Sequence, residues 1–175
     1  MALVIRELRP EDIPPIAAGE RAQGWLRAAE DKYVQRLKDK AEGKAIAVLC
    51  AELDGEPVGY VSLYAPKGNG VFPSLPEIVD LGVLKKARRR GIGSALLVAA
   101  EALAKERAAG VYLAVGLHPG YGSAQRLYIR RGYLPDGKGA YYGETPCEEY
   151  ASYPLDDDLV LYLSKDLPKT ISCPR

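Results

Sequence analysis

The stretch KKARRRGIGSALL, residues 85–97, restricts the possible folds of this chain more than any other segment. It places five cations in six positions, followed by Gly91 and Gly93 and an apolar helical pattern. The preceding segment EIVDLGVL, residues 77–84, has the composition of a strand. A strand that passes through a glycine-containing turn into a helix is typical of α/β units, so the sequence predicts that class.

The start of this helix is a candidate anion site, because unpaired N–H groups and the helix dipole favour negative charge there. Gly91 and Gly93 allow a phosphate to approach the backbone, and Arg88 and Arg90 add positive charge. We therefore expect a phosphate-bearing ligand, most simply a diphosphate. The segment is not a Walker loop, and Leu96 stands where a dinucleotide fingerprint needs its third glycine. A solvated basic turn remains the alternative.

Composition limits the class of protein further. The 175 residues fit a single domain, 1–175, and the formal net charge of +1 argues against a general nucleic-acid binder. No apolar run is long enough for a membrane span, and the N-terminus lacks a signal-peptide pattern, so we expect a cytoplasmic protein. Cys50, Cys147 and Cys173 have no C-x-x-C spacing, which predicts free thiols and no metal site.

Hydrophobic periodicity and turn residues predict the order of the elements. The predicted strands are 3–8, 45–53, 58–65, 77–84, 111–117 and 158–167, with two short strands at GYLP (132–135) and AYY (140–142); the predicted helices are 12–18, 25–41, 92–109 and 123–131. We expect Gly110 and Gly132 to end the last two helices and Ser123 to cap the fourth.

The turn DGEP makes the strands at 45–53 and 58–65 an antiparallel hairpin. The βαβ unit from 77 to 117 should have parallel or nearly parallel strands. A mixed sheet with helices on its faces follows from this order.

Three motifs resemble one family. RRRGIG, residues 88–93, fits the [QR]-x-x-G-x-[GA] acetyl-CoA signature of the GNAT superfamily of N-acetyltransferases. EIVDLGV resembles the strand before that signature, and SAQRLYIRRGY resembles the A-x-x-L-Y-x-x-x-G-[FY] helix that follows one strand later. The resemblance covers roughly residues 3–167. It implies a mixed, mostly antiparallel central sheet with helices on both faces and a splayed central strand pair.

The resemblance also implies acetyl-CoA as cosubstrate, with no metal. Backbone N–H groups from residues 89–94 would bind its diphosphate, and residues 81–83 would pair with the pantetheine arm as an added strand does. The residues expected around the coenzyme are Leu81, Gly82, Val83, Arg88, Arg89, Arg90, Gly91, Ile92, Gly93, Ser94, Ala124 and Arg130. Gly82 suits a bulge in its strand. Tyr121 departs from the family pattern, since many members have there an Asn that contacts the arm.

The resemblance places a leaving-group acid at Tyr128, a phenol with an ordinary pKa near ~10 that can protonate a thiolate. A buried aromatic on an amphipathic helix is the alternative. The backbone N–H of Val83 is the expected oxyanion donor.

Glu77 is the first candidate base and Asp80 the second. They should face opposite sides of their strand unless a bulge intervenes. Either carboxylate could instead cap the strand or pair with a cation, and a water relay could replace a direct base. His118, the only histidine, is a further candidate base, but His118-Pro119 at the start of a loop favours its interpretation as a structural or exposed residue.

The acceptor side is expected near residues 144–158, which carry six carboxylates and no cation. We expect Tyr141, Tyr142, Asp156 and Asp157 to bind a cationic amine; a solvated acidic loop is the alternative. The predicted activity is transfer of an acetyl group to a primary amine in a ternary complex. We expect the acceptor to be a small molecule or a peptide. We expect the protein to have no nucleic-acid or membrane partner and to be a monomer or a homodimer. A non-catalytic acyl-CoA sensor of the same fold is the alternative function.

Overall fold

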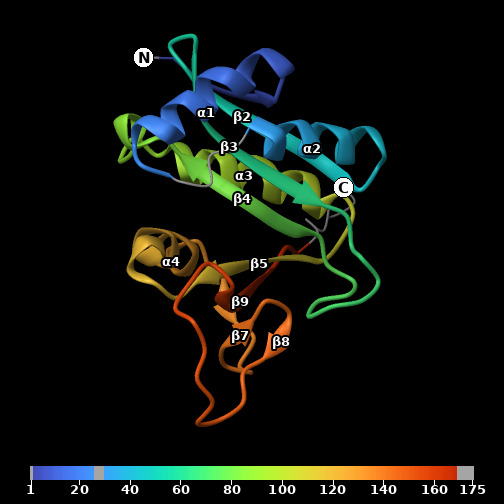
Figure 1. Ribbon diagram of the computed structural model, residues 1–175. Coiled ribbons are helices and arrows are strands. Elements are labelled where there is room, and N and C mark those ends of the chain that lie inside the picture. The colour runs from blue at the N-terminus through green and yellow to red at the C-terminus, as the bar shows by residue number, and fades with distance from the viewer. Residues whose placement is uncertain (1, 26–29, 169–175) are drawn as a thin grey trace, which may run out of the picture. The chain divides into compact units, whose positions relative to one another are not determined.

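A computed structural model describes residues 2–25 and 30–168 (Figure 1). Internal contacts divide the chain into two compact units, Met1–Ala65 with Ile78–Leu103 and Pro66–Glu77 with Ala104–Arg175. The described residues form four α-helices, and six of their strand pairs are antiparallel. The predicted class is therefore confirmed: a mixed α/β fold with a mostly antiparallel sheet.

The first unit holds the N-terminal elements and the predicted anion loop. They are β1 (Leu3–Glu7), α1 (Ile13–Ala22), α2 (Glu30–Ala41), β2 (Ala45–Leu53), β3 (Glu56–Tyr64), most of β4 (Glu77–Val83) and most of α3 (Ile92–Lys105). The strands lie in the order β1-β2-β3-β4. The predicted hairpin of β2 and β3 is confirmed. Asp54 and Gly55 in its turn have φ of 51° and 87°, as a type I′ turn requires.

Helices cover both faces of the sheet in this unit. The Tyr60 ring of β3 packs edge-to-face on Tyr33 of α2, and its hydroxyl donates to Glu20 of α1. At the preceding Gly59, a Cβ would lie 3.2 Å from Leu96 Cδ1 of α3. Successive residues of a strand point to opposite faces, so α1 and α2 lie on one face and α3 on the other.

The second unit contains the C-terminal elements. They are β5 (Gly110–Gly116), α4 (Gly122–Arg130), β6 (Leu134–Pro135), β7 (Tyr141–Tyr142), β8 (Thr145–Pro146) and β9 (Leu159–Asp166). The strands lie in the order β5-β9-β7-β8, and β6 also pairs with β9. An aromatic core forms around Tyr112, Tyr141, Val160 and Tyr162.

The first helix differs from the prediction in extent. A short 3₁₀ turn at Pro10–Asp12 precedes α1, which then runs to Ala22 instead of ending at residue 18. Within the described residues α2 begins at Glu30. Leu26 and Ala29, which belong to the predicted helix at 25–41, lie outside the described residues.

The ends of two later helices also need correction. Helix α3 ends at Lys105 instead of residue 109, and Gly110 begins β5 because it pairs with Asp166 of β9. Ser123 is not the cap of α4, since a 3₁₀ turn at Pro119–Tyr121 leads directly into the helix. Gly132, with φ of 86°, follows the C-cap residue Arg131 as predicted.

Candidate active site

The loop between β4 and α3 has the backbone geometry of an anion site. Arg89 and Gly91 adopt left-handed φ of 62° and 78°. Residues 88–91 are exposed, whereas Ile92 is buried and anchors the start of α3. Left-handed residues alternating with others turn successive N–H groups toward one side, which creates an anion-binding concavity. The free N–H groups of the first turn of α3, a helix of 14 residues, follow directly.

Arg88 is folded back toward the end of β4. Its Nε donates to the carbonyl oxygen of Val83 at 3.1 Å, and its guanidinium lies 5.6 Å from the centre of the Trp25 ring. The side chain therefore ties the loop to the strand that precedes it and contributes its charge from that position.

Strand β4 is irregular at Asp80, whose φ of 58° is left-handed. A single residue of this kind inside a strand produces a bulge-like kink. The irregularity thus lies at Asp80 and not at Gly82, whose φ is not positive. Gly82 has another reason to lack a side chain, because a Cβ there would lie 2.5 Å from the Tyr60 hydroxyl.

Each candidate base has a cationic partner that sequence reasoning missed. Lys67 Nζ lies 3.0 Å from Glu77 Oε2 and 3.4 Å from Glu144 Oε1. Arg36 Nε donates to Asp80 Oδ2 at 2.7 Å. No local pattern links Arg36 with Asp80, which lie 44 positions apart. Both carboxylates therefore take part in ion pairs. Pairing with a cation is the alternative to the role of base that the sequence left open.

Tyr128 lies on α4 and is buried, with 6% of its surface exposed. Its ring packs edge-to-face with Tyr133 at 5.8 Å between centroids. Burial raises the pKa of Tyr128 well above its ordinary value, so the hydroxyl stays protonated. A protonated phenol is the state that a leaving-group acid needs. On the same helix, Ala124 is half-buried and Arg130 is exposed.

His118 has a structural arrangement. Its Nδ1 accepts from the N–H of Gly120 at 3.0 Å, which leaves the proton on Nε2. Nε2 then donates to Asp157 Oδ1 at 3.0 Å, and the Tyr121 hydroxyl donates to the same oxygen at 3.1 Å. His118 thus orients Asp157, in keeping with its interpretation as a structural residue.

The two tyrosines expected on the acceptor side differ in exposure. Tyr141 is 2% exposed and its hydroxyl donates to Asp136 at 2.7 Å, so it belongs to the core. Tyr142 is half-buried, donates to Asp156 Oδ2 at 2.9 Å and packs on Tyr153 with centroids 5.8 Å apart. Tyr142 and Asp156 therefore form one hydrogen-bonded unit at the surface.

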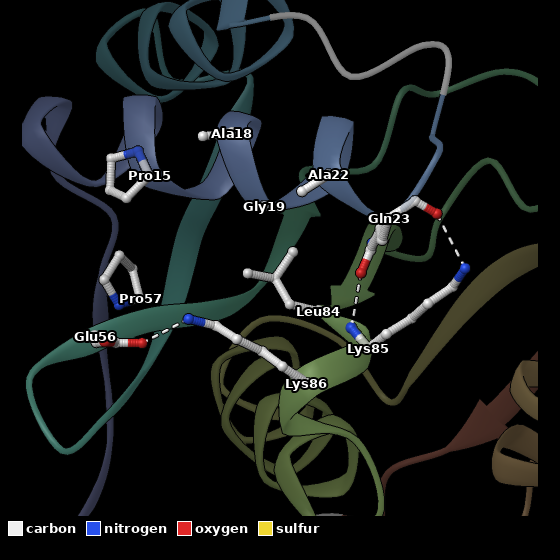
Figure 2. A pocket seen from close by; sticks show the side chains of 10 residues that line it. All are labelled: Pro15, Ala18, Gly19, Ala22, Gln23, Glu56, Pro57, Leu84, Lys85 and Lys86. Carbon is white, nitrogen blue, oxygen red and sulfur yellow. Dashed lines mark hydrogen bonds and ion pairs between the residues drawn. The ribbon is translucent and has the colours of Figure 1, made fainter.

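The first unit contains a pocket of about 670 Å³, whose lining side chains are drawn in Figure 2. It is lined by Pro15, Ala18, Gly19, Ala22, Gln23, Glu56, Pro57, Leu84, Lys85 and Lys86. Lys86 pairs with Glu56 at 2.6 Å, and Lys85 Nζ donates to the carbonyl oxygen of Gln23 at 3.0 Å. None of the predicted coenzyme, catalytic or acceptor residues lines this pocket, and its lysines are engaged by neighbours.

Three further observations concern the residues that the structure describes. Within the described residues, no helix is both long enough and apolar enough to cross a membrane. They contain no group of three or more His, Cys, Asp or Glu side chains arranged to hold a metal ion. Cys50 and Cys147 are free thiols, and burial raises the pKa of Cys50 to about 12. Cys173 lies outside the described residues.

A strand, a loop with the backbone geometry of an anion site and a helix in this order, with a protonated tyrosine on a later helix, suit a transferase that uses a phosphorylated coenzyme. Residues 7–133 match the model of the acetyltransferase (GNAT) family. An N-alpha-acetyltransferase of Sulfurisphaera tokodaii is 33% identical over 130 residues, which cover 65% of this chain and 75% of that protein.

Solved structures share the fold. Ard1 from Thermoplasma volcanium superimposes with a TM-score of 0.71 at 19% identity, covering 97% of this chain and 100% of Ard1. YncA from Salmonella typhimurium, solved with its cofactor acetyl-CoA, gives a TM-score of 0.69 at 15% identity over 100% of this chain and 99% of YncA.

The chain therefore belongs to the GNAT acetyltransferase family. Its activity class is that of an N-acetyltransferase.

Proposed function

We propose that this protein transfers the acetyl group of acetyl-CoA directly to the α-amino group of a peptide, within a ternary complex. The observation that carries the proposal is the loop before α3, where left-handed Arg89 and Gly91 lead into the helix N-terminus. The N-alpha-acetyltransferase of Sulfurisphaera tokodaii supports the choice of acceptor.

The residues of the loop fit the coenzyme. The amides of residues 89–94 would bind the diphosphate, and the φ of Gly91 together with the open space at its Cβ position suits a close approach. Residues 81–83 of β4 would hydrogen-bond the pantetheine arm, while Ala124 and Arg130 would contact the coenzyme from α4. The coenzyme supplies the activated acetyl thioester; the protein supplies binding, charge and proton transfer.

The chemistry requires three functions from the chain. A base takes a proton from the acceptor ammonium, so that the amine can form a bond to the acetyl carbon. The N–H of Val83 stabilises the oxyanion formed at that carbon. When the carbon–sulfur bond breaks, Tyr128 protonates the departing thiolate, and the second proton lost by the amine nitrogen restores the Tyr128 hydroxyl.

Glu77 is the proposed base, directly or through a water molecule. Its side chain is 15% exposed and is paired with a flexible lysine, Lys67. Asp80, by contrast, is bound by the planar guanidinium of Arg36 at 2.7 Å. An ammonium on a mobile side chain can yield to an incoming amine more readily than this guanidinium, which has a second hydrogen-bond partner in Tyr64.

The test is the release of free thiol from acetyl-CoA with a panel of peptides, amino acids and small amines. We expect turnover with peptides that have a free N-terminus, and loss of roughly 10²-fold or more in kcat for Tyr128→Phe and Glu77→Gln. Tyr133→Phe is the matched control, because it removes a hydroxyl from the neighbouring buried ring and should retain kcat.

The competing outcomes are distinct. Turnover with small amines alone would contradict the peptide acceptor. Tight binding of acetyl-CoA without turnover on any amine would favour the non-catalytic acyl-CoA sensor.

A further inference from the structure

The left-handed residue in β4 is not a glycine. Asp80 has φ of 58°, a conformation that side chains other than those of Asn and Asp rarely adopt and that costs energy even for them. Such a conformation persists only where the surroundings determine it. The side chain of Asp80 is held here by an ion pair: Arg36 Nε lies 2.7 Å from Asp80 Oδ2.

Arg36, which lies on α2, is itself held by a hydrogen bond to β3. Its Nη1 donates to the Tyr64 hydroxyl at 2.9 Å, and that hydroxyl donates to Asp39 Oδ2 at 2.5 Å. Gln35 also donates to Asp39, at 2.8 Å. One guanidinium therefore links α2 and β3 to the irregular point of β4, and its side chain is only 25% exposed.

Two residues farther along, β4 is fixed by a different contact. The Tyr60 hydroxyl occupies the space where a Cβ of Gly82 would lie, at 2.5 Å, and Tyr60 is itself held by Glu20. The backbone from Asp80 to Gly82 is thus constrained at both ends. The direction of the N–H and C=O groups of residues 81–83 depends on both constraints.

We infer that Arg36 is a positioning residue: its ion pair with Asp80 maintains the kink in β4 and thereby aims the backbone groups of residues 81–83 at the coenzyme. This inference rests on the proposed role of those residues in binding the pantetheine arm. It gives Asp80 a structural role in place of the role of base. Arg36 contacts no reacting atom and acts through the strand.

The experiment uses glycine at position 80, which removes the carboxylate but adopts positive φ without support, so Asp80→Gly alone should keep the wild-type dissociation constant if conformation and not charge is what matters. Arg36→Met keeps a long side chain and removes the ion pair, so the dissociation constant of acetyl-CoA should rise roughly tenfold, the factor expected when one strained residue loses its support. Glycine adopts positive φ without cost. In the Asp80→Gly background, Arg36→Met should therefore change the dissociation constant by less than about twofold.

Lys40→Met is the matched control, because it breaks an ion pair between α2 and Glu7 of β1 and leaves β4 untouched. Calorimetric titration of acetyl-CoA into each full-length variant gives the affinity, and thermal unfolding gives stability. A role confined to stability predicts that Arg36→Met lowers Tm as Lys40→Met does, with unchanged affinity; that outcome overturns the inference. Equal loss of affinity from Arg36→Met in both backgrounds also overturns it.

A readout without coenzyme separates this inference from the proposed function. The NMR amide resonances of Leu81, Gly82 and Val83 should shift in Arg36→Met and return toward wild type when Asp80→Gly is added. If the wild-type protein fails to bind acetyl-CoA, the proposed function is wrong, and the amide shifts still decide whether Arg36 sets the conformation of β4. Unshifted amides would refute the positioning role.

Discussion

Arg6 binds Asp12 through two parallel hydrogen bonds, from Nη1 to Oδ2 at 2.6 Å and from Nη2 to Oδ1 at 2.8 Å. Its Nε also donates to Glu52 on β2, and Asp12 accepts from the N–H of Arg9 at 2.8 Å. These contacts join β1, β2 and the start of α1. The hydrogen bonds from Arg6, opposed by burial, hold the pKa of Asp12 below its ordinary value.

We expect Asp12→Asn to lower the free energy of unfolding by about 2–3 kcal/mol near neutral pH, as loss of charged hydrogen bonds does. The pKa of Asp12 is depressed in the folded state. Its contribution is therefore fully present above the unfolded value of about 3.9 and is lost as the pH falls through the folded value. Urea unfolding across the acid range should show the gap between wild type and variant closing below about pH 4.

Asp31→Asn is the control for this change, because Asp31 is exposed on α2 and the variant should cost less than about 0.5 kcal/mol. A gap between wild type and Asp12→Asn that stays constant down to the most acidic pH would contradict the linkage.

At the scale of elements, Gly91 in the loop before α3 meets two requirements: a left-handed backbone and, in the proposed function, a close approach of the diphosphate. Gly91 has φ of 78°, and nothing lies within 4 Å of the position that a Cβ would take. An alanine there would therefore meet no clash, but the backbone would be strained. Any loss of function must then come from an altered loop conformation or from the added methyl group facing the ligand.

Gly91→Ala should lower stability by about 1 kcal/mol, which corresponds to roughly 2–4 °C in Tm. It should also raise the dissociation constant of acetyl-CoA about tenfold, since the N–H groups of the loop turn away from the diphosphate. Gly55→Ala is the matched control, with φ of 87°, no atom within 4 Å of its Cβ position and a place in the β2–β3 turn. Equal losses of coenzyme affinity in both variants would refute the anion-site interpretation.

The elements also show what sequence reasoning can predict. The extent of β2 and the start of α3 were predicted to the residue, because the apolar runs and the glycines there determine structure locally. The end of α3 was not predicted correctly. Gly110 was expected to end this helix, but it belongs to β5 because it pairs with β9, a strand distant in the sequence. The same limit applies to the candidate site. The sequence alone points to the loop at 88–93, whereas the pairing of Arg36 with Asp80 and of Lys67 with Glu77 follows from packing that no local pattern encodes.

At the scale of the whole molecule, charge is segregated along the chain. The net charge is only +1, yet five cations cluster at residues 85–90 in the first unit and six carboxylates at residues 144–158 in the second. The proposed function requires an anionic coenzyme and a cationic acceptor, so two regions of opposite charge suit the two proposed substrates. Two carboxylates of the acidic region are held in place by hydrogen bonds from residues outside it: Tyr142 binds Asp156, and both His118 and Tyr121 bind Asp157.

Neutralising Asp156 and Asp157 together as asparagines should raise KM for the amine about five- to tenfold, because the attraction for the ammonium is lost. The affinity for acetyl-CoA should not change. Glu148→Gln with Glu149→Gln is the matched control, since it removes the same charge from exposed positions in the same segment. Steady-state kinetics at low and high salt would separate diffuse electrostatic attraction from a specific contact, because salt screens diffuse attraction strongly and a specific contact much less. If both pairs raise KM equally and salt abolishes the difference from wild type, the acidic segment acts only as a solvated charge, and Asp156 and Asp157 do not bind the acceptor.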